Sequence, residues 1–97
     1  MSEASLQASG DGRLEIAGTL DFSSVPGLWL QLQQQIASHD RLSVSLQGVA
    51  SSNSAALALL LEAKDFAAAR GCELGFSDLP QGLTDLAALS NALPLLS

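Results

Sequence analysis

The sequence predicts an α/β domain in which about three helices pack on a four-stranded, mixed and mostly parallel sheet. Short segments in which apolar and polar residues alternate are typical of half-buried strands. Between them lie longer segments whose apolar residues recur at helical spacing. The expected order is strand, strand, helix, strand, helix, strand, helix. Strands joined through helices lie parallel by right-handed crossovers, whereas the first two form an antiparallel hairpin.

The hairpin is predicted from a turn between two strand segments. Residues 4–8 form a short edge strand, and the turn residues at 9–12, Ser-Gly-Asp-Gly, reverse the chain. Residues 13–20 then alternate, with Leu14, Ile16 and Leu20 on the apolar side. The second segment is therefore a strand with one buried face.

The first helix is expected to start within or just after residues 21–24 and to run to about Ser38. Asp21, Ser23 and Ser24 are candidate caps, and Pro26 suits a first helical turn. An apolar stripe follows at helical spacing, made of Val25, Leu28, Trp29, Leu32 and Ile36. Since Trp29 lies within this stripe, it is either a core residue or an anchor for a partner protein.

The third strand and second helix are expected within residues 42–71. Leu42, Val44 and Leu46 alternate with serines up to Gly48, where we expect the strand to stop. A serine-rich turn follows, and the helix begins near Ser54. Because residues 55–61 are apolar nearly all round, more than one neighbour should cover this helix, which should end at Gly71.

The remaining residues predict a short strand, a last helix and an apolar tail. Leu74 and Phe76 alternate in the strand, and Asp78 and Pro80 introduce the helix. We expect the helix to turn three leucines inward, namely Leu83, Leu86 and Leu89. The tail at residues 93–96 is too apolar for a solvated end.

Composition restricts the classes of partner. The 97 residues are enough for one domain, and with 47% hydrophobic but only 4% aromatic residues its core must be aliphatic. A net charge of −6 with four Lys and Arg argues against a nucleic-acid partner and favours a protein with basic patches. Neither a secretion signal nor a run of about 18 apolar residues is present, which indicates the cytoplasm without direct membrane insertion.

The sequence contains few residue patterns that would indicate catalysis or metal binding. Cys72 is the single cysteine, so an intrachain disulfide is excluded, and a metal site would have only His39 and carboxylates to add. No Ser-His-Asp spacing, glycine-rich phosphate loop or carboxylate pair in an apolar setting can be assembled. We therefore expect neither an enzyme nor a bound cofactor or metal.

The polar chemistry of the chain is concentrated at Asn53 and Ser54. A hydroxyl at the start of a helix meets unpaired backbone N–H groups and the positive end of the helix dipole. Such a serine can cap the helix, contact a partner, bind an anion or carry a phosphate. Asn53 is either a turn-forming residue or part of a binding surface.

Three short motifs are similar to motifs of a known protein family. The sequence reads GTLD at residues 18–21, LQGV at 46–49 and NSAAL at 53–57. Together these motifs resemble the STAS domain of anti-sigma factor antagonists and sulphate transporter tails, over almost the whole of residues 1–97. The resemblance implies a single STAS domain. In the antagonists the first serine of the third motif is phosphorylated, and Ser54 falls on that position.

Within the STAS family, the chain looks most like the MlaB-like members. The similarity is carried by the Met-Ser-Glu start, by PGLW at residues 26–29, and by LALLL at 57–61. It implies a small cytoplasmic subunit of a phospholipid ABC transporter that maintains outer-membrane lipid asymmetry in Gram-negative bacteria. The implied partner is the transporter's MlaF-like ATPase subunit and, through it, the membrane permease.

Departures from the family pattern favour a fixed contact over a phosphorylation switch. Asn53 replaces the usual aspartate, and Ala55 and Ala56 replace small or glycine residues, which stiffens the turn. We therefore expect a partner-binding surface built from Ser52, Asn53, Ser54, Leu57 and Trp29. The alternative is an anti-sigma factor antagonist switched by phosphorylation at Ser54.

Overall fold

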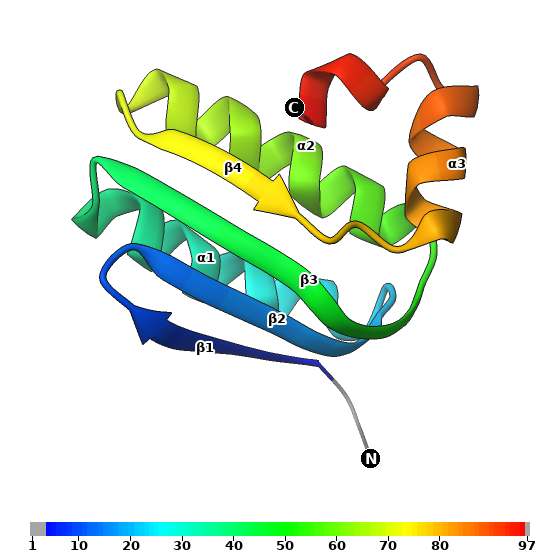
Figure 1. Cartoon of the computed structure of the whole chain (residues 1–97), viewed down its shortest axis with the longest axis horizontal. Helices are drawn as coiled ribbons and strands as arrows, with labels where there is room; N and C mark the ends of the chain where they lie inside the picture. The colour runs from blue at the N-terminus through cyan, green and yellow to red at the C-terminus, as the bar shows by residue number, and fades with distance from the viewer. Residues whose placement is uncertain (1–3, 97) are drawn as a thin grey trace.

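One four-stranded sheet carries the fold of the computed structural model, which describes residues 4–96 (Figure 1). The strands are β1 (Ser5–Gly10), β2 (Arg13–Leu20), β3 (Arg41–Ser52) and β4 (Glu73–Ser77), and they lie in this order across the sheet. β1 pairs antiparallel with β2, whereas the β2–β3 and β3–β4 pairs are parallel. The predicted mixed, mostly parallel sheet is confirmed.

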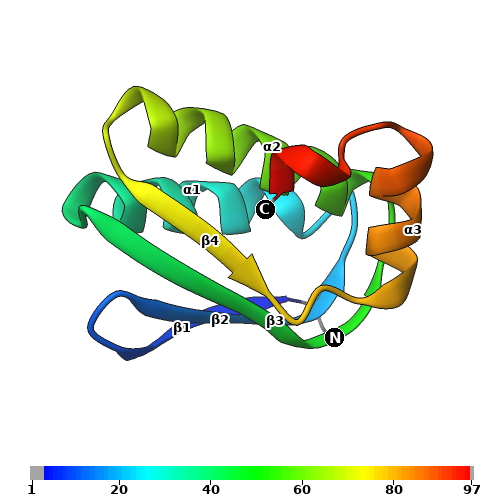
Figure 2. The same ribbon diagram turned by 45° about the horizontal axis from the view of Figure 1, so that its top comes forward.

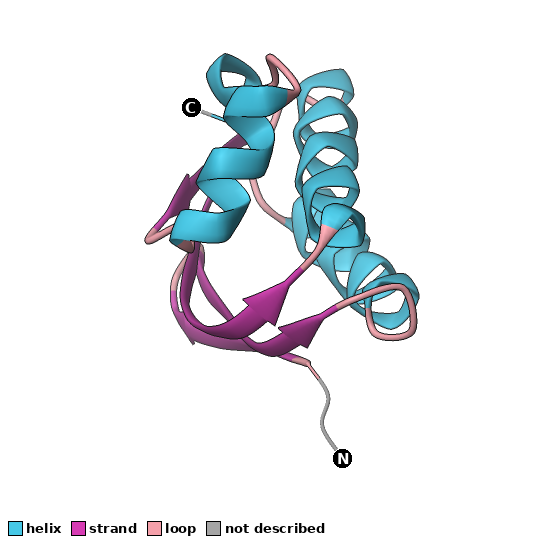
Figure 3. Ribbon diagram, turned by 90° about the vertical axis from the view of Figure 1, so that its right-hand side faces the viewer, coloured by secondary structure: helices cyan, strands magenta, loops and turns pink. Residues whose placement is uncertain are grey.

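The helices are α1 (Val25–Ser38), α2 (Ser54–Ala69) and α3 (Gln81–Leu89), followed by the 3₁₀ turn η1 (Leu93–Leu96). Figures 2 and 3 show α1 and α2 side by side on one face of the sheet. This placement follows from topology, because two right-handed crossovers that step across a sheet in the same direction put both helices on the same face.

The core lies between that face and the two helices. The inward residues of β2 and β3 are the alternating leucines, isoleucine and valine expected from the period of two: Leu14, Ile16, Leu20, Leu42, Val44 and Leu46. The start of α2 is buried on several sides, as its apolar composition predicted, because α1, α3, β4 and η1 all contact the helix.

α2 ends in a glycine-dependent cap. The amide of Cys72 donates to the carbonyl of Ala67 at 2.9 Å, and the amide of Gly71 donates to the carbonyl of Ala68 at 3.3 Å. These bonds need a left-handed residue between helix and strand, and Gly71 supplies it with φ +74°. The helix itself ends at Ala69 and Arg70 occupies the C-cap position, so Gly71, the expected C-cap, lies one residue further along and closes the cap from there.

β3 runs four residues beyond Gly48, so the expectation that the strand stops there was wrong. Beyond Gly48, β3 still pairs with β2, through Val49 beside Gly18 and Ser52 beside Leu20. Gly48 is needed inside the strand because a Cβ added there would lie 2.8 Å from the Cβ of Ala17. The glycine permits close strand approach rather than a turn.

The expectation for the last helix also needs one correction. Leu83 is buried and Leu86 is half-buried, but Leu89 is 84% exposed, and the buried position in the second half of α3 belongs to Ala87. At 100° per residue Leu89 lies about 140° around α3 from the midpoint of the buried residues Leu83 and Ala87, so it is turned away from the buried face of the helix. In the tail, Leu96 returns to the core whereas Leu95 stays exposed.

Candidate functional site

The end of β3 and the start of α2 are held against the end of β2. Ser52 lies beside Leu20 in the parallel pair, and the amide of Asn53 donates to the carbonyl of Leu20 at 3.2 Å. One residue earlier, the hydroxyls of Ser51 and Thr19 are 3.4 Å apart. The serine-rich segment is therefore strand up to Ser52, and its backbone is tied to the chain that leads into α1.

Asn53 caps α2. Its backbone is extended, and its side-chain Oδ1 accepts a hydrogen bond from the amide of Ala55 at 2.8 Å. The Asn53 carbonyl accepts from the amide of Ala56 at 2.9 Å. Of the two roles open from sequence, local structure is the one that these bonds demonstrate.

Ser54 is the first residue of α2, and its side chain is exposed. The capping bond belongs to Asn53, so the Ser54 hydroxyl is not the cap. Within residues 4–96, that hydroxyl has no hydrogen-bond partner. It stands at the positive end of the helix dipole and is available to a partner or a modifying enzyme.

The loop between β2 and α1 runs beside this segment and is held by its own side chains. Asp21 Oδ1 accepts from the amides of Ser23 and Ser24, both at 3.0 Å, and from the hydroxyl of Ser23 at 2.9 Å. Ser24 Oγ accepts from the amide of Asp21 at 3.0 Å and donates to the carbonyl of Thr19 at 2.8 Å. The loop is thereby given a defined shape.

These hydrogen bonds also act on the charge of Asp21. The hydroxyl of Ser23, followed by the backbone amides of Ser24 and Ser23, lowers the pKa of Asp21 below its ordinary value of 3.8. Each donor stabilises the ionised carboxylate more than the neutral acid. A fixed negative charge therefore lies in the loop next to the start of α2.

The structure separates the five residues expected to bind a partner. Ser52, Asn53 and Ser54 are consecutive at the start of α2, but Leu57 is only 7% exposed and belongs to the core. Trp29 is half-buried and meets Phe66 edge to face, with ring centroids 5.5 Å apart. Phe66 is twelve residues beyond Ser54, or about 18 Å along the helix axis.

Phe22, in the loop between β2 and α1, is a candidate binding residue that the sequence pattern did not indicate. Its neighbours Asp21, Ser23 and Ser24 were expected only as candidate helix caps. Phe22 is 72% exposed, two residues beyond Leu20, which pairs with Ser52 at the end of β3. The available signal was an aromatic residue flanked by loop-forming polar residues in a chain with only three phenylalanines.

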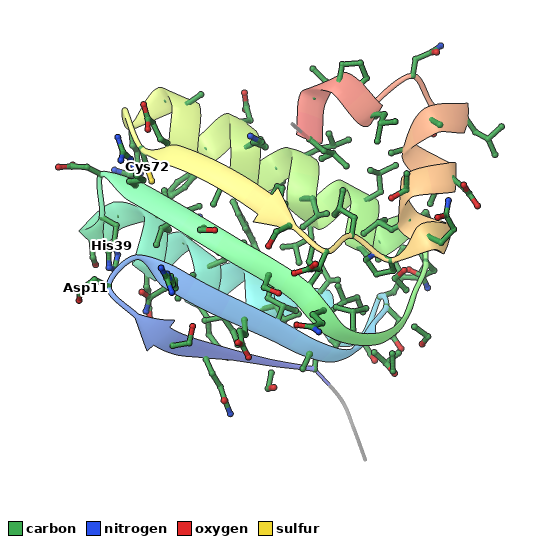
Figure 4. All side chains as sticks on the ribbon, in the orientation of Figure 1. Asp11, His39 and Cys72 are labelled. Carbon is green, nitrogen blue, oxygen red and sulfur yellow. The ribbon has the colours of Figure 1, made fainter. Side chains whose placement is uncertain are left out.

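Other ionisable groups lie away from this surface. Asp11, His39 and Cys72 are at the opposite end of the sheet from the start of α2 (Figure 4). Burial, followed by the charges of Asp40 and Glu73, raises the pKa of the Cys72 thiol. Among residues 4–96, no group of three or more His, Cys, Asp and Glu side chains could hold a metal ion.

None of the helices in the described part of the chain is long and apolar enough to span a membrane.

The exposed polar groups at the start of α2 form an open surface. It consists of a capped helix end, the exposed Ser54 hydroxyl and a loop held by the hydrogen bonds of Asp21. Such a surface suits contact with another protein.

Three solved structures illustrate how widely this fold is shared. The unphosphorylated form of the anti-sigma factor antagonist SpoIIAA matches with a TM-score of 0.74 at 14% identity, covering 95% of this chain and 84% of that one. A chain in the complex of the diguanylate cyclase SiaD with its activator SiaC from Pseudomonas aeruginosa matches with a TM-score of 0.61 at 14% identity, covering 97% and 84%.

A third structure, Mglu, matches with a TM-score of 0.62 at 17% identity, covering 78% of this chain but only 19% of that one. At these identities the likeness shows the fold alone. No curated protein matches the sequence. The family model described as MlaB, STAS domain, in contrast, matches residues 4–95, and the chain therefore belongs to the MlaB-type STAS domain family.

Proposed function

We propose that this chain is a non-catalytic accessory subunit of an ABC-type phospholipid transporter of the Mla kind. In this proposal residues 1–97 act as a single STAS domain that binds the MlaF-like ATPase subunit and supports its assembly and activity. The chain would stay in the cytoplasm, at the inner-membrane face, and would reach the permease through the ATPase. The transporter would serve the lipid asymmetry of a Gram-negative outer membrane.

The family match over residues 4–95 is the observation that carries this proposal. STAS domains are generally non-catalytic and bind partner proteins. The start of α2 supports a binding role, because it offers an exposed Ser54 hydroxyl on a helix end that Asn53 already caps. The net charge of −6 suits a basic surface on the partner.

In mechanism, the chain would contribute contact and not chemistry. The α2 start and the loop between β2 and α1 are held rigid before binding, so little conformational entropy is lost when they dock. Docking would hold the ATPase subunit in a productive arrangement. ATP binding and hydrolysis would belong wholly to that subunit.

Co-purification with the cognate ATPase tests the proposal. We expect the wild-type chain to be retained on the immobilised ATPase and Ser54→Arg to be lost, because an arginine there places bulk and charge in the contact. Ala69→Arg is the matched control, since Ala69 is also exposed and lies at the other end of α2. If the wild-type chain does not bind, the function is wrong; if Ser54→Arg binds as well as Ala69→Arg, the interface is wrong.

A phosphorylation switch is the second candidate function. The exposed hydroxyl of Ser54 at the family's phosphorylated position favours it. Two observations oppose a switch. Asn53 carries a side-chain carboxamide where a carboxylate would assist the kinase, and the Oδ1 atom of that carboxamide already accepts the capping hydrogen bond from the backbone N–H of Ala55. Intact-mass measurement of the chain from its native cells decides, because a regulated adduct of about 80 Da would support the switch and its absence in every growth condition would contradict it.

A further inference from the structure

We infer that Phe22 is the aromatic anchor of this surface and inserts into an apolar pocket, bordered by Lys or Arg, on the ATPase subunit. The inference rests on the proposed function and adds a residue to the interface. Aromatic side chains that enter a pocket near the centre of an interface commonly dominate its binding energy.

Phe22 is the aromatic side chain that the fold leaves unused. The chain has one tryptophan and three phenylalanines. Trp29 and Phe66 contact each other between α1 and α2, and Phe76 lies 5.9 Å below the ammonium group of Lys64. Phe22, in contrast, is 72% exposed. Singly exposed apolar residues are common on protein surfaces, but aromatic residues, phenylalanine included, are enriched at protein–protein interfaces.

The loop presents Phe22 in a defined position. Asp21 accepts three hydrogen bonds from the two residues that follow Phe22, and Ser24 ties the loop back to Thr19. Phe22 is therefore enclosed by a closed set of bonds between its neighbours. Because these bonds hold the backbone on both sides of Phe22, only the side-chain torsions of the ring have to be ordered on binding, which improves affinity.

Phe22 is also adjacent to the surface already proposed for binding. It follows Leu20 by two residues, and the carbonyl of Leu20 accepts from the amide of Asn53, which precedes Ser54. The loop before α1 and the loop before α2 lie at the same end of the sheet in Figures 1 and 2. One partner surface can therefore contact Phe22 and Ser54 together.

Charge indicates the chemistry of the partner pocket. The Asp21 carboxylate beside Phe22 is kept ionised by its hydrogen bonds, and the whole chain carries a net charge of −6. A pocket that accepts the ring must therefore tolerate a neighbouring anion. An apolar pocket bordered by Lys or Arg meets both requirements, because the ring fills the pocket while the cations face the carboxylate.

The test measures affinity for the purified ATPase subunit by calorimetry or interferometry. We expect Phe22→Ala to weaken binding about 30-fold, the effect typical of a hot-spot residue, and Phe22→Trp to retain most of the affinity. Leu95→Ala is the matched control, because Leu95 is 61% exposed but lies on η1 beside Leu61. Thermal unfolding of each variant should match that of the wild-type chain, since these side chains contribute little to the core.

The possible results separate the two proposals. Failure of the wild-type chain to bind would overturn both the function and the anchor. Binding that Ser54→Arg abolishes but Phe22→Ala leaves unchanged would overturn the anchor alone. Equal losses in Phe22→Ala and Leu95→Ala would also overturn it, because the effect would then reflect exposed apolar area and not this position.

Discussion

Asn53 shows how one residue sets the local structure of the candidate site. Its side chain caps α2, its carbonyl begins the helical hydrogen bonding, and its amide bonds to Leu20 in the neighbouring strand. The same residue that departs from the family's aspartate therefore keeps the capping role that an aspartate would have had. What it removes is the negative charge next to Ser54.

Replacing Asn53 by alanine should lower the free energy of unfolding by about 1 kcal/mol, because the amide of Ala55 loses its acceptor. Asn53→Asp should leave the stability close to that of the wild-type chain, since a carboxylate caps equally well. Urea unfolding followed by circular dichroism measures both variants. A loss of the same size in Asn53→Asp would show that the cap is not the cause.

Asp21 makes the stability of the loop depend on pH. Its pKa is lowered in the folded chain, so its contribution is fully present above the ordinary value of 3.8 and is lost as the pH falls through the folded pKa. Asp21→Asn keeps an acceptor oxygen but removes the charge. We expect the difference in unfolding free energy between wild type and Asp21→Asn to shrink as the pH falls below 3.8. A difference independent of pH would contradict this account.

At the scale of elements, the strands and helices follow from the periodicity, whereas their ends depend on neighbours. β2 spans the expected residues 13–20, and α1 ends at Ser38 as expected. β3 does not stop where a glycine suggested, because its last residues find partners on β2. A glycine in a strand marks either an end or a close approach, and only the facing residue, Ala17, distinguishes the two.

Gly48→Ala should therefore destabilise the chain by about 1–3 kcal/mol, since the new methyl group would overlap Ala17. The double variant Gly48→Ala with Ala17→Gly should recover part of the loss, because it restores the space. Gly75→Ala is the control: a Cβ there meets no atom within 4 Å, so this variant should not be destabilised and should gain up to about 1 kcal/mol from the reduced freedom of the unfolded chain. Chemical unfolding of the four proteins tests the pair, and the absence of recovery in the double variant would argue against the close contact.

In the whole molecule, an aliphatic core between one sheet face and two helices stabilises the fold. The reactivity of the Cys72 thiol measures how tightly one end of this core is packed. The thiol is buried, and burial raises its pKa, so both protonation and access oppose its reaction. We expect a thiol reagent to modify Cys72 slowly in the native chain at neutral pH and rapidly in urea.

A surface cysteine supplies the control for that measurement. Ser9→Cys in a Cys72→Ala background places a thiol on exposed β1, and it should react at once in the native chain. Rapid native reaction of Cys72 would mean that the end of β4 opens far more easily than the packing there implies.

The order of the elements, the faces of the strands and the STAS family can all be predicted from the sequence, because they depend on periodicity and on short local motifs. Tertiary structure alone decided which candidate residues are available to a partner. Leu57 is in the core, Trp29 lies against Phe66, and Leu89 faces solvent, since each depends on what packs opposite.

The same reason explains Phe22 and Ser54. They are 32 positions apart in the chain, and nothing local indicates that they are neighbours. The parallel pairing of β2 with β3 brings their loops to one end of the sheet, and the bond between Leu20 and Asn53 holds them there. Local patterns predict elements, whereas the composition of a surface depends on long-range pairing.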